Sequence, residues 1–524
     1  MSDSQEPPRE GSAPPAARLT RGFGQKAGLI FFGRLIQGIG QLAMGAILVH
    51  ILDKESFAVL AFLLLLYATV STLVVMAMPE NVLFFLPKQG PAERKATAWQ
   101  ILRVLGVMGV IAGALILACR LFPDAVFADV RRAAIYSPFM AAYALLDVPA
   151  LMLPNLLIAE DHHRWASWVS ILQTIGQALA VLVPCLLGLP LWMPFAWLVG
   201  YGALHFAALL VVMYVLYRRV PAVPARVTLR EHASFALPLG LSNIMGQVTR
   251  QFDKYVVLYV IGVMSFADYS VGAWEIPLVT VLPYSIGAAI VPVLVRMFEE
   301  RRPLDALAAW KSTIPKTSLL VLPIAVVFLI CADDFIELVF GAAYLNAATP
   351  LRLYTIILFQ RVVEYGAIMR AAGDTKAVLH CTIILFVSNA ALSIPFAYGI
   401  GFNGPALATL LANVPSFVYA IHRIARATHS TWRNAFPWAA YGRILGLAAV
   451  AAIPAVGFRY AVVLSAGPDL AIVATGYLLL FAGLATVTGV IRREDWAFVG
   501  RWLSMKQLVV RSGPRDLPRD RPTP

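Results

Sequence analysis

The chain has 524 residues, of which 60% are hydrophobic and 14% are charged, and its mean hydropathy is +0.75. This composition excludes a soluble globular protein. It indicates an all-α polytopic membrane protein, because helices satisfy their own backbone polar groups in lipid. The formal net charge of +13 would suit a nucleic-acid binder, but its distribution follows membrane topology, so we expect no nucleic-acid partner.

Along the chain, about fourteen apolar runs are long enough to be membrane helices. They cover residues 28–51, 57–78, 99–119, 133–158, 168–188, 192–217, 235–261, 270–295, 311–331, 350–371, 377–398, 403–422, 436–460 and 468–490. A polar tail rich in Pro, Ser and Ala precedes them at residues 1–26, and we expect it to be disordered. A basic segment follows them at residues 491–524. The connections are short, so we expect a transporter and not an enzyme.

The basic residues are distributed unevenly between alternate connections. With the N-terminus inside, 29 of the 42 Lys and Arg residues lie in inside segments, five in outside loops and eight within the apolar runs. Cytoplasmic segments are enriched in Lys and Arg, so we predict a cytoplasmic (inner) membrane protein with both termini in the cytoplasm. The four cysteines show no paired spacing, and we expect no disulfide, metal site or cofactor.

The seventh run, residues 235–261, carries a polar stripe through its middle. Its members are spaced four, three and four residues apart, which places them on one helix face: Asn243, Gln247, Arg250 and Lys254. A central cation costs roughly 2.5–3.5 kcal/mol by insertion scales, so such residues usually face a bundle interior or a wet cavity. We therefore predict a cationic, solvent-filled cavity. The other interpretation is that Arg250 pairs with Asp253 and merely pins this helix to a neighbour.

Other charged residues also lie inside the apolar runs. Arg34 lies one to two turns into the first run, and Arg361 is central in the tenth. The acids within runs are Asp147, Asp253, Glu275 and Glu364. Glu364 follows Arg361 by three residues, so the two can pair on one helix face. Cations outnumber acids in the membrane interior, which favours an anionic passenger. Prolines within or beside the apolar runs mark where helices can bend, including the fourth run: Pro149, Pro154, Pro277, Pro283, Pro292 and Pro395.

Three stretches of the sequence resemble the Wzx-type flippases of lipid-linked oligosaccharides, within the multidrug/oligosaccharidyl-lipid/polysaccharide (MOP) exporter superfamily. The first is residues 28–62, where LDKE at residues 52–55 replaces the family's usual Gly-Pro before the acid. The second is residues 235–277. The third is residues 340–413, with FGAAYLNAATPLRLY, MRAAGDTKAVLH and GFNGPALATLLAN. The resemblance covers the first twelve apolar runs and leaves the last two outside it.

The resemblance implies two six-helix lobes, residues 27–217 and 235–422, which face each other around a central cavity. A cytoplasmic linker, residues 218–234, joins the two lobes. Two additional helices follow at residues 436–490. It also implies the passenger, an oligosaccharide on undecaprenyl pyrophosphate that alternating access moves to the outer leaflet for surface polysaccharide biosynthesis. We expect four cations to bind the pyrophosphate: Arg250, Lys254, Arg34 and Arg361. Two amides, Asn243 and Gln247, support them.

Several alternatives stay open at this point. Four acids either carry coupling protons or Na⁺ or serve only as partners of the arginines: Asp253, Glu364, Asp147 and Glu275. A peptidoglycan lipid-precursor flippase would need similar phosphate-binding cations. A cation-coupled multidrug antiporter of the same superfamily would favour an acidic cavity. A non-transporting scaffold would tolerate substitution of the charges inside the membrane. The expected partners are polysaccharide assembly proteins and the lipid bilayer.

Overall fold

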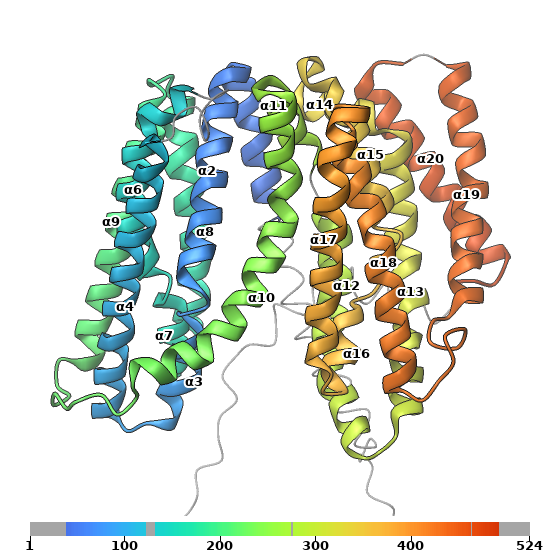
Figure 1. Cartoon of the computed structure of the whole chain (residues 1–524). Coiled ribbons are helices and arrows are strands. Elements are labelled where there is room, and N and C mark those ends of the chain that lie inside the picture. Colours follow the sequence, from blue (N-terminus) through green and yellow to red (C-terminus); the bar gives the residue numbers. More distant parts are fainter. Residues whose placement is uncertain (1–37, 122–130, 274–275, 463, 492–524) are drawn as a thin grey trace, which may run out of the picture.

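The computed structural model describes residues 38–121, 131–273, 276–462 and 464–491, and the regular structure in these ranges is helical throughout (Figure 1). Eleven helices in this part of the chain are long and apolar enough to cross a membrane. The fold is therefore that of an all-α, multi-pass membrane protein, as the composition predicts.

Three of the expected spans do not appear among those eleven helices. The first run is described only from Gly38 to Ile51, as a short apolar helix. The seventh forms α10 (Leu229–Val256), which continues through a π-helical turn (Val257–Ile261) and carries the polar stripe. The tenth is broken into α15 (Ala348–Ile357) and α16 (Tyr365–Ala371). The expected number of fourteen spans is thus not confirmed.

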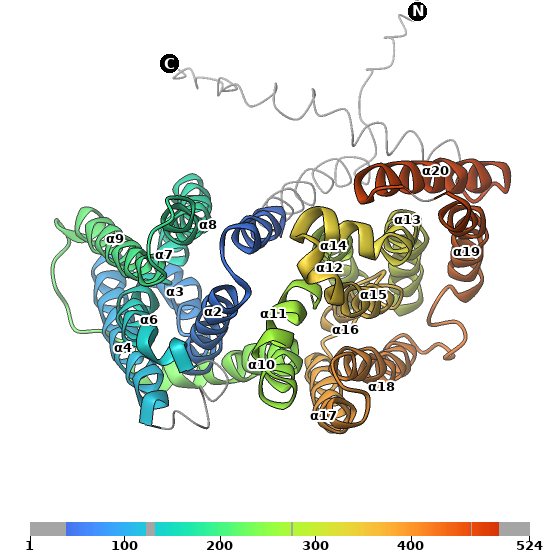
Figure 2. The ribbon, with the colours of Figure 1, turned by 90° about the horizontal axis from the view of Figure 1, so that it is seen from above.

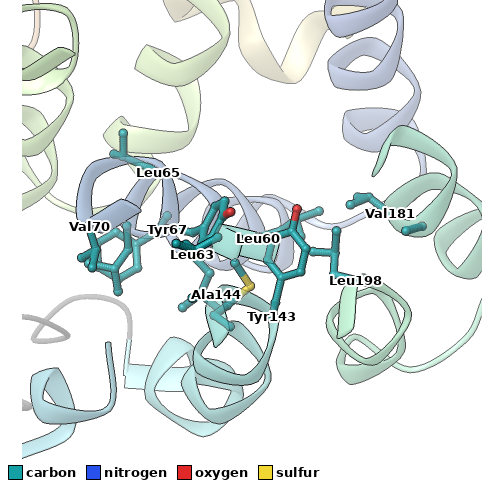
Figure 3. Close-up of a cluster of buried hydrophobic side chains, with 14 of the residues drawn as sticks. Leu60, Leu63, Leu65, Tyr67, Val70, Tyr143, Ala144, Val181 and Leu198 are labelled. Carbon is teal, nitrogen blue, oxygen red and sulfur yellow. The ribbon is translucent and has the colours of Figure 1, made fainter. Parts of the chain in front are cut away.

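The N-terminal lobe is built around closely packed helices and a shared apolar core. Its helices are α2 (Lys54–Val75), α3 (Glu80–Phe85), α4 (Pro91–Ala118), α6 (Arg131–Ala150), α7 (Leu153–Ala159), α8 (His163–Leu186) and α9 (Trp192–Tyr217). Tyr67 of α2 and Tyr143 of α6 lie side by side in the core, with ring centroids 4.7 Å apart (Figure 3). α4 lies against α6 at Gly113, where an added Cβ would lie 2.9 Å from the Ala141 carbonyl oxygen. Small residues allow such close packing of membrane helices.

The bend predicted in the fourth run is confirmed. Pro149 lies next to the last residue of α6, and Pro154 lies in the first turn of α7. The two helices are separated at Leu151 and Met152. A proline ring removes one backbone hydrogen bond and clashes with the preceding turn, which ends or bends a helix.

The C-terminal half contains the second lobe and two outlying helices. It continues from α10 through α11 (Val263–Gly272), α12 (Pro277–Glu299), α13 (Pro303–Ile330), α14 (Ala332–Phe340), α15, α16, α17 (Thr375–Ile400), α18 (Gly404–Ala427), α19 (Trp438–Ala461) and α20 (Ala466–Val487). The expected start of the eighth run at residue 270 is wrong, because α11 ends at Gly272 and Pro277 begins a separate helix. Figure 2 shows α19 and α20 on the outer side of this lobe.

The two lobes meet at one end of the molecule and diverge toward the other. In Figure 1, α10 runs obliquely between them, from the base of the N-terminal lobe toward α11 at the upper end. In the first half of α10, about three turns from its start, Gly240 packs on the break after α2, where an added Cβ would lie 2.6 Å from the Met76 Cα. Met76 and Ala77 have φ values of 46° and 58°, so α2 stops there in a left-handed turn.

The connections that the charge pattern assigns to one side lie at one end of the fold. Figure 1 places the α3–α4, α9–α10 and α12–α13 connections at the lower end, opposite α11 and α14. These connections include Lys88, Arg218 and Arg301. Their common position agrees with the predicted alternation of spans.

Candidate functional site

The start of α10 is fixed by a capping box. The Glu231 N–H donates to Thr228 Oγ1 over 3.3 Å, and the Thr228 N–H donates to Glu231 Oε2 over 2.7 Å. This reciprocal pair satisfies two backbone donors at the helix start. The hydrogen bond from the Thr228 backbone is the main cause that lowers the pKa of the exposed Glu231 carboxyl. Glu231 thus stays ionised at the positive end of the helix dipole.

The polar stripe occupies the face of α10 between the two lobes. On one side of the stripe, Asp253 accepts a hydrogen bond from Tyr354 of α15. On the other side, the Tyr255 hydroxyl donates to Thr69 Oγ1 of α2 over 2.9 Å. Successive helix residues turn by about 100°, so the stripe falls on the arc between these two contacts. It faces the side between α2 of one lobe and α15 of the other.

The stripe residues are accessible on this face. Asn243 and Arg250 are exposed, and Gln247 and Lys254 are half-buried. Arg250 Nη2 donates to Gln247 Oε1 over 2.9 Å, so the amide helps to hold the guanidinium along the helix. The structure thus places the predicted stripe on one accessible face with two cations on successive turns.

Asp253 points away from the stripe into packed protein. It is 1% exposed and accepts hydrogen bonds from Tyr269 of α11, over 2.9 Å, and from Tyr354 of α15. Its second carboxyl oxygen accepts from the Lys254 backbone N–H over 2.9 Å. This carboxylate ties α10 to two other helices. Sequence spacing gave no sign of the two tyrosines, which lie 16 and 101 residues further along the chain.

Arg361 and Glu364 line a second site within the C-terminal lobe. The chain between α15 and α16, residues 358–364, is not helical, so the spacing argument for an Arg361–Glu364 pair on one helix face is wrong. Glu364 instead forms an ion pair with Arg370 of α16, and Arg361 Nη2 donates to Asn413 Oδ1 over 3.3 Å. A cavity of about 340 Å³ includes Arg361, Glu364 and Asn413 in its lining.

Asp147 lies in a third place, the core of the N-terminal lobe. Its Oδ1 lies 2.9 Å from Nδ1 of His205 on α9, and its Oδ2 accepts from the Tyr67 hydroxyl of α2. The other ring nitrogen of His205 contacts the Gln173 amide of α8. Sequence reasoning missed His205, although a histidine in the middle of the sixth apolar run was a visible signal.

The remaining two predicted residues, Arg34 and Glu275, lie outside the described residues. Of the predicted cations, Arg250 and Lys254 share the stripe of α10, whereas Arg361 lines the cavity inside the C-terminal lobe. The convergence of all four cations on one cavity therefore stays a prediction. The structure brings two of them together.

A polar contact that the sequence did not suggest joins the lobes at the end where they meet. Lys54 at the start of α2 forms a 2.6 Å ion pair with Asp268 of α11 and donates to the Ala343 carbonyl over 3.0 Å. The Lys54 ammonium also lies 5.0 Å from the centre of the Tyr344 ring. Burial raises the pKa of Tyr344 to about 12, so its hydroxyl stays neutral beside this cation. Asn346 Nδ2 donates to the same Asp268 over 3.3 Å.

A family model described as polysaccharide biosynthesis protein matches residues 47–349, more than half of the chain. The chain belongs to this family. No curated protein matches the sequence.

Solved structures with a similar fold are membrane transporters and a flippase. A lipid II flippase MurJ in an inward closed conformation superposes with a TM-score of 0.65 at 15% identity, covering 88% of this chain and 98% of that one. An inward-facing multidrug resistance MATE family transporter of the MOP superfamily superposes with a TM-score of 0.59 at 16% identity. This match covers 77% of this chain and 99% of that one. A MOP superfamily transporter from Pyrococcus furiosus superposes with a TM-score of 0.52 at 15% identity. This match covers 80% of this chain and 100% of that one. These similarities show that the chain has the MOP transporter fold.

Proposed function

We propose that this protein is a flippase that moves an oligosaccharide linked to undecaprenyl pyrophosphate across the cytoplasmic membrane for surface polysaccharide biosynthesis. The observation that carries the proposal is the face of α10 between the lobes, where Arg250 is exposed and Lys254 is half-buried. A pyrophosphate suits this pair, because Arg binds phosphate oxygens in a bidentate manner and Lys supplies a point charge. Membership of the polysaccharide biosynthesis family supports a saccharide passenger.

The proposed mechanism is alternating access of the two lobes. The passenger enters from the cytoplasmic end, where the lobes diverge in Figure 1, and Arg250 and Lys254 hold its head group while the polyprenyl tail stays in lipid. The lobes then rock about α10 and separate at the opposite end. Separation there breaks the Lys54–Asp268 ion pair. Arg34 and Arg361 are further candidates for contact with the anionic head group along the path.

The acids differ in how completely they are bonded, and this difference suggests their roles. Asp147 and Asp253 are held by tyrosine hydroxyls and, for Asp147, by a histidine. We assign both a structural role. Glu364 has a buried Oε2 without a hydrogen-bond partner among the described residues, in the lining of the cavity that also contains Arg361. We therefore propose Glu364 as the acid that takes up a coupling H⁺ or Na⁺, with Glu275 as a second candidate from the sequence.

The test is deletion of the gene in its native host, followed by complementation with Arg250→Ala/Lys254→Ala. The proposal expects loss of surface polysaccharide on deletion and no recovery with this variant at normal protein level. The matched control is Arg218→Ala/Arg219→Ala, which removes two exposed cations from the end of α9 and should restore the polysaccharide. Full recovery with the α10 variant would contradict the proposal.

A second candidate function is transport of a peptidoglycan lipid precursor. The TM-score of 0.65 to a lipid II flippase, over 88% of this chain, favours it. The same deletion separates the two functions, because loss of a peptidoglycan precursor flippase stops growth, whereas loss of a surface polysaccharide flippase leaves viable cells. A cation-coupled multidrug antiporter is disfavoured, since the accessible face of α10 carries two cations.

A further inference from the structure

A separate open cavity of about 870 Å³ lies between α13 and the two outlying helices α19 and α20. Its lining includes Lys316 of α13, Arg443 of α19 and Thr488 just after α20. None of these helices carries Arg250, Lys254 or Arg361. The cavity is therefore distinct from both sites described above.

Within the described ranges, no acidic side chain forms an ion pair with either cation of this cavity. Lys316 and Arg443 come from different helices and are both exposed. Among the described residues, neither forms an ion pair, whereas Arg423, Arg352 and Arg459 in the same half of the chain each do. Two cations that line one cavity repel each other, and an anion between them removes this repulsion.

The cavity has an apolar wall next to its cations. Leu319 of α13 and Ile444 and Leu447 of α19 belong to its lining. Thr488 and Gly489 follow the end of α20 at its basic, predicted cytoplasmic end. An amphipathic ligand suits such a surface, with an anionic group at the cations and hydrocarbon along the leucines.

We propose that this cavity binds the phosphate group of an anionic membrane lipid, with Lys316 and Arg443 as its ligands and its acyl chain along Leu319 and Leu447. Bound there, the lipid fills the space between α13 and the pair α19–α20. The inference does not depend on the passenger proposed above, because it concerns other helices and other cations.

The test compares lipids retained by the purified full-length protein, measured by native mass spectrometry. The protein is first equilibrated with equal amounts of phosphatidylglycerol and phosphatidylcholine. The wild type should retain phosphatidylglycerol over phosphatidylcholine by about tenfold or more, as two interfacial cations predict. Lys316→Gln/Arg443→Gln should bring this ratio close to one. The matched control Arg218→Gln/Arg219→Gln loses the same charge elsewhere and should keep the wild-type ratio.

A second variant tests the cavity without changing its charge. Gly446 is part of the lining, and an added Cβ would meet no atom within 4 Å. Gly446→Trp should therefore fill the space and lower phosphatidylglycerol retention while both cations remain. An unchanged ratio in both cavity variants would overturn the proposal. If inorganic phosphate removes the phosphatidylglycerol preference in the wild type, the anion is a soluble phosphate and the lipid assignment is wrong.

Discussion

Lys54 Nζ lies 2.6 Å from Asp268 Oδ1, and this ion pair connects the start of α2 in the N-terminal lobe to α11 in the C-terminal half. Asp268 is 4% exposed, so the contact is partly shielded from solvent. Asn346 and the Ala343 carbonyl complete a polar cluster at the same place. The lobes are thus joined by hydrogen-bonded charges at the end where they meet.

We predict that Lys54→Ala weakens closure of this end of the protein. A partly exposed ion pair contributes roughly 1 kcal/mol or less, so the fraction of molecules open at this end should rise by up to about fivefold. Spin labels on α2 and α11, measured by double electron–electron resonance, should show a larger population at long distance.

The control for this prediction is the charge exchange Lys54→Asp/Asp268→Lys. It restores opposite charges across the contact and should return the distance distribution toward that of the wild type. A distribution that is the same in the wild type and in Lys54→Ala would show that the ion pair does not hold the lobes together.

We predict that two substitutions of Asp253 behave differently. Asp253→Ala leaves the buried hydroxyls of Tyr269 and Tyr354 without their acceptor, which costs about 1–3 kcal/mol for each unsatisfied group. Asp253→Asn keeps one acceptor oxygen and should retain most of the stability. Thermal unfolding in detergent should therefore rank the wild type first, Asp253→Asn next and Asp253→Ala last.

Transport by the same two variants tests the structural role of Asp253. If the carboxylate only ties α10 to its neighbours, Asp253→Asn at normal protein level should restore surface polysaccharide. A stable Asp253→Asn protein without transport would instead make Asp253 a coupling acid.

We predict a large stability loss when the buried pair in the N-terminal lobe is broken. The side chains of His205 and Asp147 are 5% and 7% exposed, and a buried acceptor left without its hydrogen-bond partner costs about 1–3 kcal/mol, or more when it is a charged group. His205→Ala should therefore lower the unfolding midpoint markedly in a thermal scan. His422→Ala, at an exposed position of α18, is the control and should leave the midpoint nearly unchanged. Equal midpoints for the two variants would contradict the paired arrangement.

We predict that Gly240→Ala destabilises the contact between α10 and the break after α2. The new methyl group would lie 2.6 Å from Met76 backbone atoms, and overpacking of this kind typically costs about 1–3 kcal/mol. Gly442→Ala on α19 meets no atom within 4 Å and should be neutral or slightly stabilising, because Ala is the better helix former by about 0.5–1 kcal/mol. The prediction fails if both variants unfold at the same temperature.

The sequence predicted the parts of the fold that depend on local composition. Long apolar runs define most spans, and the spacing of Asn243, Gln247, Arg250 and Lys254 correctly placed them on one accessible helix face. Pro149 and Pro154 marked a real bend, whereas Pro283, Pro292 and Pro395 lie inside the continuous helices α12 and α17. These features follow from helix period and from proline geometry, which neighbours along the chain determine.

The sequence did not predict features that depend on tertiary contacts. The break between α15 and α16 gave no strong local signal, and it gives Glu364 an ion pair with Arg370 in place of the expected helix-face pair with Arg361. The tyrosines that bind Asp253 are distant in the chain, as is Asp268 from Lys54. Only the packed fold brings such partners together.

The most direct test of the central claim is binding of undecaprenyl pyrophosphate to the purified protein, compared with undecaprenol, which has the same tail without phosphate. We predict that the wild type prefers the pyrophosphate and that Arg250→Ala/Lys254→Ala weakens its binding by about tenfold or more, since charge-assisted hydrogen bonds contribute about 1.5–3 kcal/mol each. Binding of undecaprenol should be unchanged. Equal affinity of the wild type and this variant for the pyrophosphate would contradict the account.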